Sequence, residues 1–398
     1  MKKYLFSELI EEITELNTEL LYGLDDIVGV TIEKGLIPTI ANLTKTELNK
    51  FYIVKPDAFV FNPRTHGVRL GMGYNDTENT YITSWNNVAF KVKGEARTLL
   101  NPEYLWLYFN RTEWDRETNY HAWGSSTIVF SWNTFRNLSI KLPEKEVQDK
   151  IVRQYKVIKN RIKLKKQIND NLRASASIMF FNKIRYVQCS ECCQETEIGR
   201  YPIEWTLSTL GDVLDTIIDR RGLTPTKLGS EWSNEGIIAL SAKSVKNHEL
   251  VNLDIANHVD NDLYNRWMPQ KLQSQDILMT SEAPLGEFYY LADFSTYCLS
   301  QRLFAMRANK TIIEPTVLYF QLTDSIGKHQ IDIRKTGTTV TGIRQSELIQ
   351  VPIIVPPMNI QKEFARFCNP IMITIEKNAD EIRQLFKLQE MLLSRLSR

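Results

Sequence analysis

The stretch that decides the fold occurs twice in this chain. Residues 123–148 read WGSSTIVFSWNTFRNLSIKLPEKEVQ, and residues 336–361 read TGTTVTGIRQSELIQVPIIVPPMNIQ. A shift of 213 positions aligns them without a gap and matches identical residues: Gly124 with Gly337, Ile140 with Ile353, Pro143 with Pro356 and Gln148 with Gln361. Between these identities, hydroxyl residues match hydroxyl residues and apolar residues match apolar ones. Self-similarity at a long fixed interval indicates two copies of one domain.

The bulk composition indicates a folded chain of two to three domains. It has 398 residues, of which 43% are apolar and 10% aromatic, too many for wholesale disorder. Five cysteines without an even framework favour a reducing compartment. Acidic residues from Glu8 onward precede any run that could act as a signal peptide, and the uncharged stretch 348–361 is short and broken by prolines. We therefore expect a cytoplasmic protein without a membrane partner.

Positive charge is concentrated in one segment. Residues 141–187 carry thirteen Lys and Arg against four Asp and Glu, whereas the net charge of the chain is +2. Such a run indicates an acidic partner, either nucleic acid or an acidic protein surface, with a solvated helix face as the alternative. The candidates for this contact are Lys159, Arg161, Lys163, Lys165 and Lys166.

Four blocks follow one another along the chain. Short strand-like runs fill the first and third blocks, and helical periodicity fills the second and fourth. The sequence therefore predicts an α+β protein, in which two similar domains are separated by two long antiparallel helices that form a coiled coil with a pseudo-two-fold repeat. The expected bounds are 1–142 for the first domain, 143–187 for the central helix, 188–355 for a linker and the second domain, and 356–398 for the C-terminal helix.

Apolar residues recur at steps of three and four in both helical blocks, which predicts a narrow apolar seam on each helix. The residues expected between the helices or against a partner are Ile151, Tyr155, Ile158, Ile162, Leu172, Phe364, Phe367, Ile371, Ile382, Leu385 and Leu392.

Some short stretches of the sequence are close to catalytic or metal-binding motifs, but each motif is incomplete. Asn101-Pro-Glu-Tyr104 is close to the Asn-Pro-Pro-Tyr motif of amino-methyltransferases, but position 103 is Glu and no glycine-rich element precedes it. Pro102 is better explained as the first residue of a helix. Cys189, Cys192 and Cys193 form half of a zinc site without a second pair of ligands, so a linker with thiols is the preferred interpretation. The sequence predicts neither a catalytic residue nor a metal site.

Loops rich in cations and hydroxyl groups indicate binding. The loop at 62–69 has its expected counterpart at 281–286, and the loop at 334–344 has its counterpart at 121–127. Such side chains commonly contact phosphates and base edges. The DNA-contact candidates are Arg64, Thr65, His66, Arg69, Ser125, Ser126, Arg220, Arg221, Lys243, Lys246, Arg334, Lys335, Thr338, Thr339 and Arg344.

Together these features resemble the DNA-specificity subunit of type I restriction–modification systems, over the whole chain. The resemblance is carried by Pro202–Trp205, Leu210-Gly-Asp-Val213, Glu282-Ala-Pro-Leu-Gly286 and Gly337–Gln361. The opening of the first domain, Phe6–Asn42, lacks a clear Leu-Gly-Asp element.

The resemblance implies a non-catalytic subunit. Two target-recognition domains would each read one half of a bipartite DNA target, and the helices would set the spacing and dock two methyltransferase subunits. Restriction subunits would complete the assembly, and the partners would bind S-adenosylmethionine, ATP and Mg²⁺. The alternatives are the specificity subunit of a related system with a fused methylase–nuclease partner, or a two-headed coiled-coil scaffold without a DNA role.

Overall fold

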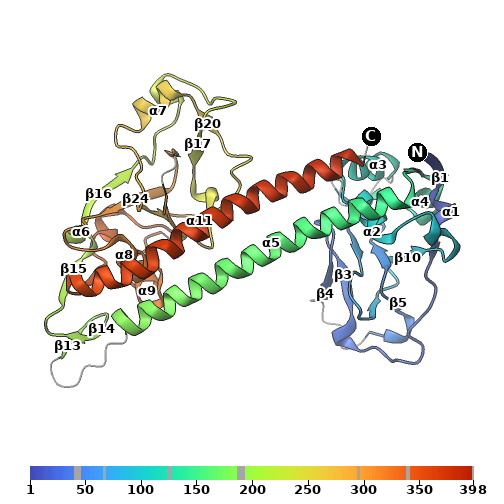
Figure 1. The fold of residues 1–398 in the computed structure, drawn as a ribbon, viewed down its shortest axis with the longest axis horizontal. Coiled ribbons are helices and arrows are strands. Elements are labelled where there is room, and N and C mark those ends of the chain that lie inside the picture. The colour runs from blue at the N-terminus through green and yellow to red at the C-terminus, as the bar shows by residue number, and fades with distance from the viewer. Residues whose placement is uncertain are drawn as a thin grey trace. The chain divides into compact units, whose positions relative to one another are not determined.

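The computed structural model describes residues 1–39, 46–65, 69–122, 128–185, 193–293, 296–337 and 341–396. The chain divides into two compact units. Unit 1 comprises Met1–Ile162 with Gln384–Arg398, and unit 2 comprises Lys163–Arg383. Figure 1 shows the elements of both units and labels many of them. Within the described ranges, no helix is long and apolar enough to span a membrane.

Unit 1 contains an antiparallel sheet in the order β2-β10-β6-β8. Its strands are Ile10–Glu12, Val88–Val92, Ala58–Phe61 and Met72–Tyr74 in that order. The helices of the unit are α1 (Phe6–Leu9), α2 (Pro102–Phe109), α3 (Thr112–His121) and α4 (Trp132–Asn137). Two-stranded pairs complete it: β1 (Lys2–Leu5) with β12 (Ser139–Leu142), β3 (Val28–Val30) with β4 (Leu36–Pro38), β5 (Tyr52–Val54) with β9 (Tyr81–Thr83), and β7 (Arg64–Thr65) with β11 (Ile128–Val129).

Unit 2 repeats this plan with the sheet β16-β24-β21-β22. Its strands are Leu214–Asp219, Leu303–Ala308, Ile277–Thr280 and Phe288–Tyr290 in that order. The corresponding helices are α6 (Leu210–Val213), α8 (Pro315–Thr323), α9 (Ser325–Asp332) and α10 (Gln345–Leu348), and β15 (Thr206–Thr209) pairs with β25 (Pro352–Val355). Its other elements are β13 (Cys193–Thr196), β14 (Gly199–Pro202), β17 (Ile237–Leu240), β18 (Val245–Lys246), β19 (Glu249–Leu250), β20 (His258–Val259), α7 (Asn261–Trp267) and β23 (Cys298–Leu299). The expected duplicated α+β fold is confirmed, because both units have the same strand order.

The central strand of each sheet is buried on both faces. In β6, Phe59 and Phe61 pack into an aromatic core beside the helices, whereas Ala58 and Val60 pack into a smaller core on the other face. This division follows from the two-residue period of a strand. In β21, Met279 and its neighbour Leu278 divide between two cores in the same way. Each sheet therefore separates a helical layer from a second, loop-rich layer.

The missing opening element of the first domain is present in the structure. Helix α1 follows β1 as α6 follows β15, and the amide of Leu5 donates to the Glu8 carboxylate at 2.6 Å. The amide of Thr209 donates to Asp212 in the corresponding way, at 3.2 Å. Phe6-Ser-Glu-Leu9 thus takes the place of Leu-Gly-Asp-Val, and the repeat in unit 1 begins with the first strand of the chain.

Two long helices follow the repeats. Helix α5 (Lys145–Phe180) has 36 residues and continues as a π-helical turn over Phe181–Arg185, and α11 (Met358–Arg395) has 38 residues. At 1.5 Å per residue each is about 55 Å long. Within unit 2 the helices run antiparallel, because Lys165 pairs with Glu381 at 2.9 Å and Lys183 pairs with Glu363 at 2.6 Å. The antiparallel pair was expected.

A glutamine connects each long helix to its repeat. Gln148 is fully buried; its Nε2 donates to the carbonyls of Leu99 (2.8 Å) and Pro143 (2.9 Å), and its Oε1 accepts from the amide of Asn101 (3.0 Å). Gln361, 213 positions later, makes the same three bonds. Its partners are Ile312 O (3.0 Å), Pro356 O (2.7 Å) and the amide of Glu314 (2.8 Å). The partners are shifted by the same 213 positions, so the start of each helix is held in the same way.

The linker between the repeats departs from one expectation. Cys193, at the start of β13, is disulfide-bonded and is not a free thiol. Cys189 and Cys192 lie outside the described residues.

Candidate nucleic-acid interface

At one end of the unit 1 sheet, two loops far apart in sequence meet. The loop after β6 forms strand β7, which pairs antiparallel with β11. The amide of Phe130 donates to the carbonyl of Pro63 at 2.8 Å. Within the described residues, the loop region predicted at 62–69 therefore lies beside Ile128–Val129, which directly follows the second predicted loop region in sequence. Arg64 on β7 is exposed, and its amide is capped by the Asn62 side chain at 2.9 Å.

Unit 2 has the same junction at the same end of its sheet. Glu282 forms an antiparallel bridge with Gly342, and the amide of Ile343 donates to the carbonyl of Ser281 at 3.0 Å. Ile343 lies 213 positions after Phe130, so the repeat extends to this contact. A Cβ at Gly342 would lie 3.0 Å from the Ser281 carbonyl oxygen, which explains why the close approach needs glycine.

The hairpin β18–β19, together with the 3-10 helix just before it (Ala242–Ser244), carries lysines at this end of unit 2. Lys243 and Lys246 are exposed, and the amide of Asn247 donates to Glu287 at 2.7 Å, directly after the loop at 281–286. His248 Nδ1 lies 2.8 Å from the Tyr319 hydroxyl oxygen. Burial, together with the nearby charges of Lys328 and Arg173, lowers the pKa of His248 to about 4. The imidazole is therefore neutral at physiological pH, and the hairpin is fixed by a neutral hydrogen bond.

Several predicted cations are already bound within the protein. Arg221 pairs with Asp219 at 2.7 Å, and its guanidinium lies 4.1 Å from the centre of the Phe304 ring. Arg220, beside it, has a buried Nε without a hydrogen-bond partner among the described atoms. Arg69 Nε lies 3.8 Å from Asp115. Arg221 is therefore engaged within the protein, whereas Arg69 keeps a side chain that is 55% exposed.

The candidates at 334–344 differ in their surroundings. Arg334 donates to the carbonyl and the side chain of Gln330, and Lys335 pairs with Asp332 at 2.7 Å. Arg344 is exposed and precedes helix α10. Thr65 lies in β7 by its backbone, and five candidates lie outside the described residues: His66, Ser125, Ser126, Thr338 and Thr339.

The lysines of α5 are largely paired. Lys159 contacts Asp76 at 3.0 Å and Lys156 contacts Glu103 at 2.6 Å. Lys165 donates to Asn378 at 2.7 Å in addition to its pairing with Glu381. Exposed pairs of this kind are weak and can exchange with phosphates, but Lys165 lies in the helix interface and is not a surface cation.

Several of the residues expected between the helices or against a partner lie in or against the cores of the units. Ile151 and Tyr155 pack against the aromatic core of unit 1, and Leu172, Phe364 and Ile371 belong to the main core of unit 2 or pack on it. Of the remaining candidates, Ile158, Ile162 and Ile382 are buried, and Leu385 and Leu392 are half-buried. Phe367 is 41% exposed, because the inward stripe runs through Phe364 and Cys368, so it stays a candidate for contact with a partner.

A polar cluster inside the helix pair was not foreseen. The Asn378 side-chain amide donates to Asn169 Oδ1 at 2.7 Å, and Asn169 Nδ2 donates to the carbonyl of Ile375 at 3.3 Å. Glu376 is also buried; it accepts from the Tyr289 hydroxyl (2.7 Å) and the Asp293 amide (2.6 Å), and burial raises its pKa. Single polar residues in an apolar stripe give no periodic signal from which these contacts could be read.

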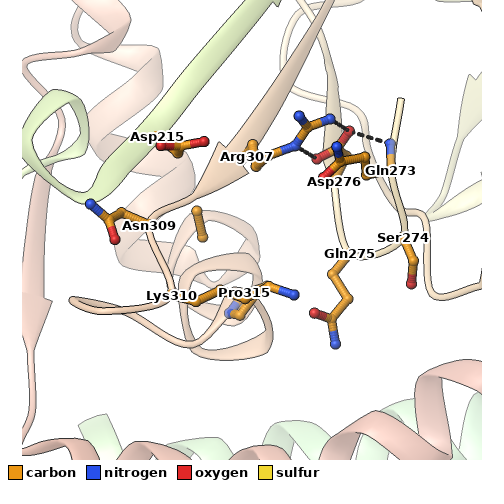
Figure 2. A pocket seen from close by; sticks show the side chains of 10 residues that line it. Asp215, Gln273, Ser274, Gln275, Asp276, Arg307, Asn309, Lys310 and Pro315 are labelled. Carbon is orange, nitrogen blue, oxygen red and sulfur yellow. Dashed lines mark hydrogen bonds and ion pairs between the residues drawn. The ribbon is translucent and has the colours of Figure 1, made fainter. Parts of the chain in front are cut away.

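The opposite end of the unit 2 sheet carries a hollow of about 290 Å³. Figure 2 shows that the guanidinium of Arg307 faces the carboxylate of Asp276, which also accepts from the amide of Gln273. The carboxylate of Asp276 is engaged in bonds that join β21 to β24. We therefore assign this hollow a structural role and not a binding role. Over the described ranges, no cluster of three His, Cys, Asp or Glu residues could hold a metal ion.

Comparison with known proteins agrees with this architecture. The family model described as the type I restriction modification DNA specificity domain matches twice, over residues 17–174 and 202–386. The chain therefore belongs to the type I restriction–modification DNA specificity family, and it contains two such domains.

Individual relatives are more distant. The chain is 25% identical over 263 residues to a protein named as the putative type I restriction enzyme MjaX specificity subunit of Methanocaldococcus jannaschii; the match spans 66% of this chain and 59% of that protein. The crystal structure of a type I restriction–modification S subunit from M. genitalium is similar with a TM-score of 0.59 at 12% identity, over 99% of this chain and 95% of the other. At this identity the likeness concerns the fold alone.

Proposed function

We propose that this chain is the non-catalytic DNA-recognition subunit of a type I restriction–modification complex, and that each unit reads one half of a bipartite DNA target. The observation that carries the proposal is the junction of two loops at the same end of both sheets, held by the equivalent hydrogen bonds of Phe130 and Ile343. A repeated reader linked by a stiff spacer gains affinity only when both half-sites lie at the right distance.

The charges at the two junctions support reading of different half-sites. Position 64 in unit 1 is an exposed arginine, whereas the position that forms the same bridge in unit 2 is Glu282. Lys246 lies on the hairpin of unit 2, and Lys243 lies in the short 3-10 helix just before it. A shared scaffold with different side chains at its reading end is suited to an asymmetric target.

The helices are proposed to set the spacing and to dock two methyltransferase subunits. Exposed apolar residues on α5 and α11 support docking, since apolar residues in an unpaired helix face are a common basis for protein contacts. Examples are Val157, Leu164, Ile178, Phe367 and Met391. Restriction subunits would join in the complete complex.

The partners would bind S-adenosylmethionine, ATP and Mg²⁺, and the assembly would act on chromosomal and invading DNA in the cytoplasm. The spacing proposal has a simple consequence. Insertion of one heptad in both helices adds about 10 Å, which corresponds to about three base pairs.

The test is methylation mapping in a host that expresses this chain with the methyltransferase gene beside it, compared with the same host lacking this chain. The expected result is a new methylated-adenine motif in two parts with a fixed gap. An active methyltransferase that produces no new motif would overturn the proposal and favour a two-headed scaffold.

A further inference from the structure

A single arginine lies at the centre of the unit 2 junction and was not among the sequence candidates. Arg302 directly precedes β24, and its carbonyl accepts from the amide of Ser281 at 2.9 Å. Its Nε lies 3.0 Å from Oε1 of Glu282, and the two side chains are 50% and 38% exposed. Glu282 in turn forms the bridge with Gly342. The pair is thus fixed to the sheet and to both loops while its outer edge remains in solvent.

We propose that Arg302 reads a guanine in the second half of the DNA target and that Glu282 is the positioning residue that orients its guanidinium. The proposal rests on the proposed DNA-recognition function and assigns a base contact within it. Arginine recognises guanine by donating to O6 and N7 through two nitrogens, which is the most common specific contact in the major groove.

The geometry of the ion pair leaves this fork available. Glu282 approaches the guanidinium at Nε. Across the described part of the chain, the terminal nitrogens of Arg302 make no hydrogen bond to another residue. A carboxylate held against Nε restricts rotation of the guanidinium, so that less rotamer entropy is lost when the terminal nitrogens meet a base.

The backbone at this position is difficult to explain by stability alone. Arg302 has φ of 64°, in the left-handed region that favours glycine or asparagine, and Ala283 next to Glu282 has φ of 49°. A half-exposed ion pair stabilises a fold only slightly, which does not offset an unfavourable backbone. Unfavourable backbone conformations cluster at binding sites, where they aim a side chain.

The contact is specific to one unit. Asn87 directly precedes β10 as Arg302 precedes β24, and its side-chain amide already donates to Thr83 at 2.8 Å. The bridge position equivalent to Glu282 is Arg64, which is exposed. Unit 1 therefore lacks the Glu–Arg pair at this position, and we expect the guanine contact in the second half-site only.

The experiment is methylation mapping of the complete complex with Arg302→Gln, Arg302→Lys and Glu282→Gln. The matched control is Arg266→Gln, which removes an exposed arginine paired with Asp262 at 3.0 Å on α7. For Arg302→Gln we expect cognate methylation to fall about 10- to 100-fold and one base pair of the second half-site to lose its preference for guanine, with the first half-site unchanged. Glu282→Gln should relax the same base pair less strongly, and the double variant should resemble Arg302→Gln.

Two results would overturn the proposal. One is an unchanged motif with Arg302→Gln; the other is an equal loss on every sequence, which would indicate a phosphate contact. If Arg302→Gln fails to fold, Arg302→Lys decides, because it keeps the ion pair but not the two-nitrogen fork, and a motif unchanged in Arg302→Lys refutes the base contact. Failure of the proposed function is distinct, since the unsubstituted chain would then give no bipartite motif.

Discussion

Replacement of Gln361 by Glu tests whether the buried glutamine holds helix α11 to its repeat. The substitution keeps the shape and the acceptor for the Glu314 amide (2.8 Å). It replaces Nε2, which donates to Ile312 O at 3.0 Å and Pro356 O at 2.7 Å, by an oxygen. An ionised carboxylate cannot donate, so a negative charge would face two carbonyl oxygens inside a fully buried site.

The expected loss follows from the bonds removed. Two hydrogen bonds disappear and the new buried charge gains no partner. Together these changes lower the free energy of unfolding by about 3 to 5 kcal/mol at pH 7.5. For a unit of this size that lowers the melting temperature by about 6 to 20 °C. Protonation restores one donor, so the pKa of the new carboxyl is raised above its usual value. Stability should then be highest at low pH and fall as pH rises through that raised pKa.

The assay is thermal unfolding of the full chain at pH 5 and pH 7.5, with Gln350→Glu as the control because Gln350 is exposed on the same repeat. Gln148→Glu should behave alike, since Gln148 makes the same three bonds in unit 1. A Gln361→Glu protein that melts within 2 °C of the control at pH 7.5 would refute the assigned role.

Three further substitutions have expected outcomes. The pKa of His248 is about 4 in the folded protein against about 6.5 in the unfolded chain. The neutral imidazole therefore contributes about 3 kcal/mol to the free energy of unfolding above pH 6.5, and this contribution is lost as pH falls toward 4. Urea titrations should show that the stability of His248→Asn lacks this dependence on pH. Asn169→Leu should lower the free energy of unfolding by about 1 to 3 kcal/mol, because the amide of Asn378 loses its acceptor. The double variant, with Leu at both positions, should recover this stability in thermal melts; a double variant as unstable as the single one would contradict this. Asp276→Asn should cost about 3 to 5 kcal/mol because Arg307 is left buried without its carboxylate, and unchanged chemical denaturation would show the pair to be dispensable.

Local pattern predicted the long helices and the duplication. Periodicity of apolar residues indicates a helix wherever it packs, and the long helices α5 and α11 lie in the two periodic blocks. The interpretation of Pro102 as the first residue of a helix is confirmed by α2, and α8 begins at Pro315, which lies 213 positions later. Local pattern missed α1, because Phe6-Ser-Glu-Leu9 keeps the acidic cap but not the sequence of its counterpart.

The sequence by itself determined that two copies of one domain alternate with two amphipathic helices, because repeats and periodicity are properties of the chain alone. Only the tertiary structure decided which cations remain free. Lys165 and Arg221 are engaged by carboxylates that sheet and helix packing place beside them, whereas Arg302 gains its position from a bridge between loops about sixty residues apart. Such contacts depend on how strands pair in space. A single arginine before a strand has no sequence pattern from which they could be predicted.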